Sequence, residues 1–101
     1  MKDKTGMKAS TLRRAEKSLF EAVSCVESAS EAEDFLRDLC TPAELQALVD
    51  RWAVVGLLRE GMTYRDINAK TGVSVTTVGR VARFLEDGHG GYQAVIDRLE
   101  S

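Results

Sequence analysis

Apolar residues recur every three or four positions along most of the chain, a spacing that is typical of amphipathic α-helices. This pattern predicts a long first helix over Lys8–Val26. A short second helix is expected to end at Cys40, with Ser30 as its N-terminal cap and Glu33 in the capping-box position. No segment alternates between apolar and polar residues as a strand next to a hairpin turn would, so the fold class is predicted to be all-α.

The clearest helix start in the chain is the segment Thr41-Pro42-Ala43-Glu44. Its threonine can accept a hydrogen bond from the amide of Glu44, and the glutamate carboxylate can accept one in return. Proline at the first helical position has no amide that would be left unsatisfied. The helix that follows is expected to end at Gly61, and a final helix is predicted over Tyr92–Leu99.

Residues 62–86 have the pattern of a helix-turn-helix. Thr63 can cap a first helix of about eight residues that ends at Gly72, and Ser74 can cap the second helix. The short connection makes the two helices cross at about 90–120°, which brings their apolar residues together. The residues expected to face inward are Ile67, Val73, Val75, Val78 and Val81.

Inward-facing valines leave the opposite face of the second helix free to contact DNA. In a helix-turn-helix this helix lies in the major groove with its first residues on base edges, where Arg80 can donate two hydrogen bonds to a guanine. Asn68 departs from the usual small residue beneath the second helix, so we expect it to turn aside and Ala69 to pack instead. The predicted DNA contacts are base edges for Thr76, Thr77 and Arg80, phosphates for Tyr64, Arg65, Lys70 and Arg83, and Ser74 at the helix N-terminus.

The composition is that of an ordinary globular domain, with 44% apolar and 30% charged residues. A net charge of −2 would disfavour DNA binding if the charges were evenly distributed, but they are not. Residues 1–20 carry +4 and residues 61–85 carry +3, whereas residues 21–60 carry −6. Because a phosphate responds to charges within about 10 Å, the two basic segments permit DNA binding despite the acidic total.

No enzymatic or metal centre is predicted. The single histidine, His89, lies among glycines, and we find no carboxylate pair, nucleophile with a base, or phosphate-binding glycine loop. Cys25 and Cys40 lack paired spacing and are expected to be reduced and buried. The sequence has neither a run of about 20 apolar residues nor a signal segment, so we expect a cytoplasmic protein without membrane contact, with residues 1–7 as a flexible lead.

Four segments of the chain resemble the YerC/YecD-type proteins of the Trp repressor superfamily, and the likeness covers nearly everything from Ser18 onward. The segments are Asp38–Leu45, Leu57–Tyr64, Thr71–Ser74 and Gly90–Leu99. The resemblance implies a bacterial DNA-binding protein with a Trp-repressor-like fold. It also implies an intertwined homodimer that interlocks through its long N-terminal helices.

The dimer agrees with the size of the chain, because six helices with wide apolar faces bury too little surface within 101 residues. Trp52 is expected to lie in the core or at the dimer interface. We expect a single domain over residues 8–101, in which 8–60 dimerise, 62–86 bind DNA and 92–100 form the C-terminal helix.

The resemblance also raises the possibility of a tryptophan corepressor. The repressor's pocket uses a threonine and two arginines, and Thr41, Arg51 and Arg80 match these. Val81 and Phe84, however, stand where the repressor has glycine and serine, and we expect them to fill the space of an indole. The sequence therefore predicts a transcription regulator, acting as a repressor, without a cofactor.

Three alternatives remain at this stage. An adaptor would use the helix-turn-helix surface to bind proteins, and a gated repressor would respond to an unknown small-molecule effector. The DNA-binding part of a recombinase would need a separate catalytic subunit. A steep salt dependence of DNA binding would favour the hypotheses in which the protein binds DNA over the adaptor hypothesis.

Overall fold

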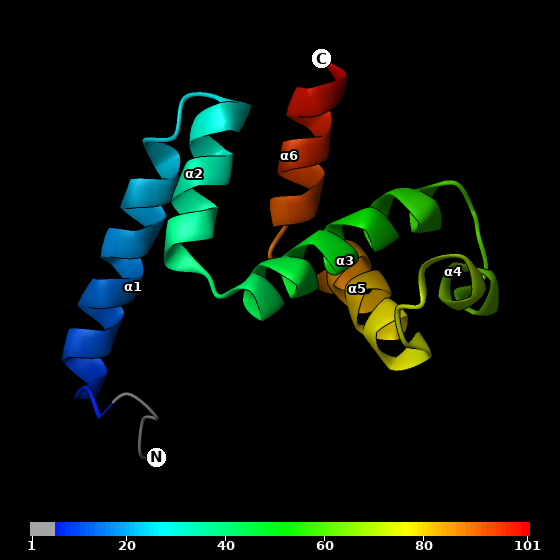
Figure 1. Ribbon diagram of the computed structural model, residues 1–101, viewed down its shortest axis with the longest axis horizontal. Helices are drawn as coiled ribbons and strands as arrows, with labels where there is room; N and C mark the ends of the chain where they lie inside the picture. The colour runs from blue at the N-terminus through cyan, green and yellow to red at the C-terminus, as the bar shows by residue number, and fades with distance from the viewer. Residues whose placement is uncertain (1–5) are drawn as a thin grey trace. The chain divides into compact units, whose positions relative to one another are not determined.

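The computed structural model describes residues 6–101, and these form six α-helices and no β-strand (Figure 1). The helices are α1 (Ala9–Ser24), α2 (Ala29–Leu39), α3 (Pro42–Arg59), α4 (Tyr64–Thr71), α5 (Val75–Asp87) and α6 (Gly91–Glu100). The predicted all-α fold class is thereby confirmed. Within the described range, no helix is long and apolar enough to cross a membrane. The predicted lead over residues 1–7 lies outside the described residues except for Gly6 and Met7, which precede α1.

Contacts along the backbone divide the chain into two compact units. The first extends to Leu39 and contains α1 and α2, and the second, Cys40–Ser101, contains α3 to α6. Neither α1 nor α2 has a buried residue. Every buried apolar side chain among residues 6–101 belongs to the second unit. The helix-turn-helix therefore has a core of its own, and the first two helices do not.

The core of the second unit lies between α3, α4 and α5, which all contact one another. Val54 and Val55 of α3 pack in one cluster with Ile67, Val78 and Val81. None of these five side chains is more than 1% exposed. Burial of a side chain of this size stabilises the fold by about 1.5–3 kcal/mol. The predicted packing of the first helix of the motif against the second is confirmed.

The prediction that Val75 faces inward is wrong, because its side chain is 46% exposed. A helix turns by about 100° per residue, so side chains spaced by three positions drift by about 60° around its axis at each step. Since α5 centres its buried face on Val78 and Val81, this drift carries Val75 to the edge of that face. The first residue of α5 is therefore open to solvent.

The predicted starts of α3, α4 and α5 are confirmed by their capping hydrogen bonds. The amide of Glu44 donates to Thr41 Oγ1 at 3.2 Å, and the amide of Thr41 donates to Glu44 Oε1 at 2.8 Å, which completes the capping box. Thr63 and Ser74 each accept from the amide three residues later, at 3.2 and 3.1 Å. Such a cap contributes about 0.5–2 kcal/mol, so these local signals fix where α3, α4 and α5 begin.

The predicted start of α2 is wrong by two residues. Ser28 Oγ accepts from the amide of Glu31 at 3.1 Å, and Glu31 Oε1 accepts from the amide of Glu27 at 3.1 Å. The sequence holds two overlapping capping boxes, because Ser28 and Ser30 are each followed three residues later by a glutamate. Ser28 provides the cap, with the return bond of Glu31 going to the amide of Glu27 and not to that of Ser28, and the helix therefore begins before Ser30.

The cysteines also differ from the prediction. Cys25 is exposed and Cys40 is half-buried, and both are free thiols. Cys25 follows directly after α1, in a unit whose helices bury no side chain, so the surroundings that would bury it are absent from the single chain. The prediction that both thiols are buried is therefore wrong, most clearly for Cys25.

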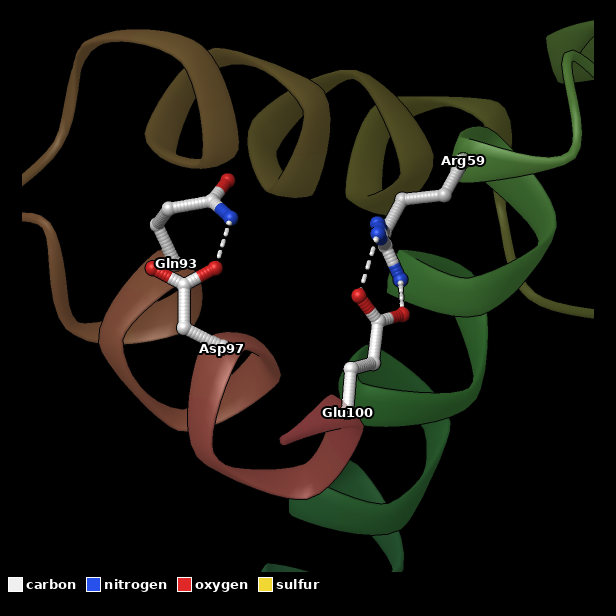
Figure 2. Close-up of polar contacts among 4 residues, drawn as sticks. All are labelled: Arg59, Gln93, Asp97 and Glu100. Carbon is white, nitrogen blue, oxygen red and sulfur yellow. Dashed lines mark hydrogen bonds and ion pairs between the residues drawn. The ribbon is translucent and has the colours of Figure 1, made fainter.

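Polar contacts attach the end of α6 to α3. Arg59 Nη1 donates to Glu100 Oε2 at 2.8 Å and Nη2 donates to Glu100 Oε1 at 3.4 Å, so the guanidinium and the carboxylate face each other across the two helices (Figure 2). The hydrogen bond and charge of Glu100 raise the pKa of the Arg59 guanidinium. Within α6, Gln93 Nε2 donates to Asp97 Oδ1 at 2.7 Å, one helical turn away (Figure 2).

Apolar contacts attach the rest of α6 to the same unit. Ile96 is 3% exposed and belongs to the core cluster. Near the start of α6, the Tyr92 ring stacks on Trp52 of α3, with ring centroids 6.3 Å apart and an interplanar angle of 28°. Trp52 remains 43% exposed, so it lies at the edge of the core and not within it.

Candidate nucleic-acid interface

The turn between α4 and α5 depends on Gly72, whose φ of 78° lies in the left-handed region. Its amide donates to the carbonyl of Asn68 at 2.8 Å and ends α4. A Cβ at this position would meet no atom within 4 Å, so the backbone conformation, and not space, favours glycine. Val73, 8% exposed, follows it into the corner between the helices, as predicted.

Two side chains of α4 hold this turn with hydrogen bonds that the sequence analysis missed. Asn68 Nδ2 donates to the carbonyl of Val73 at 2.9 Å. Thr71 Oγ1 donates to the carbonyl of Ile67 at 2.7 Å and accepts from the amide of Val73 at 3.0 Å. Asn68 thus turns aside as expected, but Ala69 is exposed and does not pack beneath α5. Ile67 fills the inner face of α4, which leaves no buried position for Ala69.

The exposed face of α5 carries Thr76, Arg80 and Arg83. These residues are spaced by four and then three positions, so they lie along one side of the helix. Together with Gly79 they line a shallow groove of about 340 Å³. The structure therefore brings a hydroxyl group and two guanidinium groups onto one continuous surface.

Thr77 and Ser74 lie at the start of α5 and are tied to each other. The amide of Thr77 donates to Ser74 Oγ at 3.1 Å, and the Ser74 hydroxyl donates to Thr77 Oγ1 at 3.0 Å. Thr77 is half-buried. Both residues thus take part in the cap, and the Thr77 hydroxyl retains its own proton for a further acceptor.

Tyr64, at the start of α4, lies against the middle of α5. A Cβ built on Gly79 would be 3.7 Å from Tyr64 Cε2, and the tyrosine is 43% exposed. This separation is an ordinary van der Waals contact, so the ring lies beside α5 without requiring glycine at position 79. Arg65 and Lys70, on the same helix as Tyr64, are exposed.

Within residues 6–101, no carboxylate is paired with a cation of the helix-turn-helix. Among residues 6–101, the side-chain ion pairs join Arg37 to Glu33 and Arg59 to Glu100. The cations of the motif, which are outside these pairs, are Arg65, Lys70, Arg80 and Arg83. Their charges are available to an external anion, as binding to a phosphate backbone requires.

Val75 joins this surface although the sequence analysis placed it in the core. It is exposed next to Thr76 at the N-terminal end of α5. An apolar side chain there can contact the methyl group of a thymine. Its position as the first residue after the Ser74 cap was the signal that could have identified it.

Comparison with known proteins places this geometry in a family. A sequence profile described as "Trp repressor protein" matches residues 14–100. The chain belongs to the Trp repressor family. The resemblance to its YerC-type members is confirmed, since the chain is 39% identical to the uncharacterized protein YerC of Bacillus subtilis (strain 168) over 82 residues, which are 81% of this chain and 79% of YerC.

Solved structures agree with this assignment to the Trp repressor family. A TrpR-like protein from Eubacterium eligens ATCC 27750 is 42% identical, with a TM-score of 0.78 over 86% of this chain and 90% of that one. A protein from Staphylococcus aureus is 36% identical, also with a TM-score of 0.78, over 93% and 95% of the two chains. Membership of the Trp repressor family indicates a helix-turn-helix DNA-binding regulator.

In this Trp repressor family member, a cavity of about 690 Å³ lies beside the exposed face of α5 that carries Arg80. It is lined by Trp52, Arg80, Phe84, His89, Gly91, Tyr92 and Val95. Of the two residues expected to fill the space of an indole, Val81 does not line this cavity, whereas Phe84 does. Val81 is 1% exposed and belongs to the core, because it shares the buried face of α5 with Val78, and Phe84 forms one wall of the cavity.

Proposed function

We propose that the protein is a homodimeric transcription repressor that places α5 in the major groove of an operator, without a tryptophan corepressor. The observation that carries this proposal is the exposed row of Thr76, Arg80 and Arg83 on a helix held by its own core. An operator occupied in this way is closed to other DNA-binding proteins. Repression by occlusion follows from that competition.

The contacts divide into those that read bases and those that position the protein. Thr76, Thr77 and Arg80 face base edges, where a bidentate arginine–guanine pair discriminates by about 1–3 kcal/mol. Val75 adds an apolar contact at the same end of α5. The contacts to phosphates come from Tyr64, Arg65, Lys70 and Arg83, and Ser74 at the N-terminus of α5.

A homodimer is supported by apolar side chains that the single chain leaves exposed. Phe20 of α1 is 64% exposed, and Val23, one residue before the end of α1, is 49% exposed. In the second unit, Val49 of α3 and Val95 and Leu99 of α6 are 52%, 48% and 69% exposed. A two-fold partner would cover such surfaces and give α1 and α2 the core that they lack. It would also set two copies of α5 about 34–36 Å apart, one turn of DNA.

The absence of a tryptophan corepressor is supported by Phe84 and Arg80. The Arg80 guanidinium carbon lies 4.6 Å from the centroid of the Phe84 ring. An aromatic side chain of the protein therefore already lies against the guanidinium group of Arg80. The open cavity beside this pair favours a second candidate, a repressor that responds to another small molecule. Saturating ligand would then change operator affinity, which a repressor without an effector would not show.

The proposal is tested by selecting binding sites from the DNA of the protein's own source. The purified full chain is incubated with sheared DNA at about 0.15 M salt, where non-specific binding is weak, and the retained fragments are sequenced. We expect enrichment of a site with two-fold symmetry. The R80A variant serves as the matched control and should lose the enrichment. Retention of DNA without any shared sequence would overturn the proposal, and a failure to retain DNA at all would favour an adaptor.

A further inference from the structure

Phe84 connects the two arginines on the exposed face of α5. The guanidinium carbon of Arg80 lies 4.6 Å from the centroid of the Phe84 ring, and that of Arg83 lies 5.4 Å from the same centroid. Both distances are within the roughly 6 Å at which a cation is attracted to the face of an aromatic ring. Each arginine is exposed, whereas Phe84 is half-buried.

The shared ring offsets two costs of presenting a pair of cations. Because both guanidinium carbons lie near one centroid, they are at most about 10 Å apart, a separation at which like charges still repel at moderate salt. Each arginine also has several freely rotating bonds, which are restricted when the side chain binds a target. A ring that attracts both cations reduces the repulsion and restricts the rotation before DNA is bound.

Phe84 lies beside other aromatic residues of the second unit. Phe84 lines the same cavity as Trp52 of α3 and Tyr92 of α6, and those two residues stack on each other. Arg80 lines this cavity on one side and the groove with Thr76 and Gly79 on the other. Phe84 therefore lies between the packed helices and the surface proposed to read DNA.

We propose that Phe84 is a positioning residue that sets the specificity of DNA recognition by orienting Arg80 and Arg83. This inference rests on the proposed function and names a residue that does not itself contact DNA. The role of Phe84 is tested by comparing the wild-type protein with the variant F84L. Leucine keeps an apolar side chain at the cavity wall but has no aromatic face for a cation.

The experiment compares the wild type, F84L and F84Y on two duplexes, the one enriched from the source DNA and a random-sequence duplex of the same length. Loss of an exposed cation–π contact corresponds to about fivefold in affinity. We expect F84L to bind the enriched duplex about fivefold more weakly and to lose less affinity for the random duplex, where only the phosphate contact of Arg83 is affected. F84Y, which keeps the ring, should bind both duplexes as the wild type does.

A double-mutant cycle separates positioning from a purely structural role. If Phe84 acts through Arg80, F84L should weaken binding much less in an R80A background than in the wild type. NMR of the free protein adds a readout without DNA, because the Arg80 Nε–H resonance should carry a ring-current shift that F84L removes. Equal losses in both backgrounds, or equal losses for F84L and F84Y, would overturn the inference.

The two proposals fail in different ways. A selective wild type whose preference survives F84L would overturn the role of Phe84 and leave the proposed function standing. A wild type that binds both duplexes equally would overturn the proposed function, and the role of Phe84 in specificity with it. The expected pattern, a selective wild type with a less selective F84L, supports both.

Discussion

Replacing Gly72 by alanine measures how much the left-handed turn between α4 and α5 contributes to stability. With φ at 78° and no atom within 4 Å of an added Cβ, the substitution changes the backbone energy and creates no clash. An L side chain in the left-handed region costs about 1–2 kcal/mol. We therefore expect G72A to lower the free energy of unfolding by that amount, and the melting temperature by at least about 4 °C.

Gly79 provides the matched control for this substitution. It lies inside α5, and a Cβ there would make an ordinary contact with Tyr64 at 3.7 Å. Glycine inside a helix is less stable than alanine by about 0.5–1 kcal/mol, so G79A should raise the stability. Urea unfolding of both variants at one protein concentration gives the two values, since a dimer's stability depends on concentration. Changes of the same sign in G72A and G79A would refute this reasoning.

Three further predictions concern DNA contacts, the turn and the dimer. R80A should lose about 1–3 kcal/mol of binding free energy on the enriched operator and reduce the preference for its sequence, whereas K70A should weaken binding to all duplexes alike and reduce the salt slope by about 1. Fluorescence anisotropy at several salt concentrations distinguishes these two patterns. Equal losses for R80A on operator and random DNA would contradict the base-reading role of Arg80. N68A should cost about 1 kcal/mol in urea unfolding because the carbonyl of Val73 loses its donor, and an unchanged midpoint would show that this bond is not stabilising. L99E should dissociate the proposed dimer in sedimentation without unfolding the second unit, since Leu99 is 69% exposed, and a persistent dimer would place the interface elsewhere.

Local signals in the sequence were sufficient for the helix starts of the second unit. Thr41, Thr63 and Ser74 each bond to an amide three residues away, so their partners are fixed by the chain itself. The same reasoning failed at α2, because Ser28 and Ser30 offer equivalent capping boxes and no local signal in the sequence decides between them. The exposure of Val75 depends on where the buried face of α5 is centred, which only its packing against α3 and α4 decides.

The contacts that the sequence did not predict depend on side-chain direction or on distant partners. Arg59 and Glu100 are 41 positions apart, and nothing in their surroundings pairs them in advance. Phe84 and Arg80 are four positions apart on one helix, a spacing at which side chains meet, so the sequence contained the signal for their contact. That Val81 lies in the core instead of the cavity required the structure.

The central claim is that two copies of α5 read bases in successive major grooves. Dimethyl sulfate methylates guanine at N7, on the major-groove edge that Arg80 is proposed to contact. The decisive measurement is methylation protection on the enriched duplex with the wild type and R80A. We expect two clusters of protected guanines about 10 base pairs apart, both lost in R80A. Unprotected guanines, or protection that persists in R80A, would contradict the central claim.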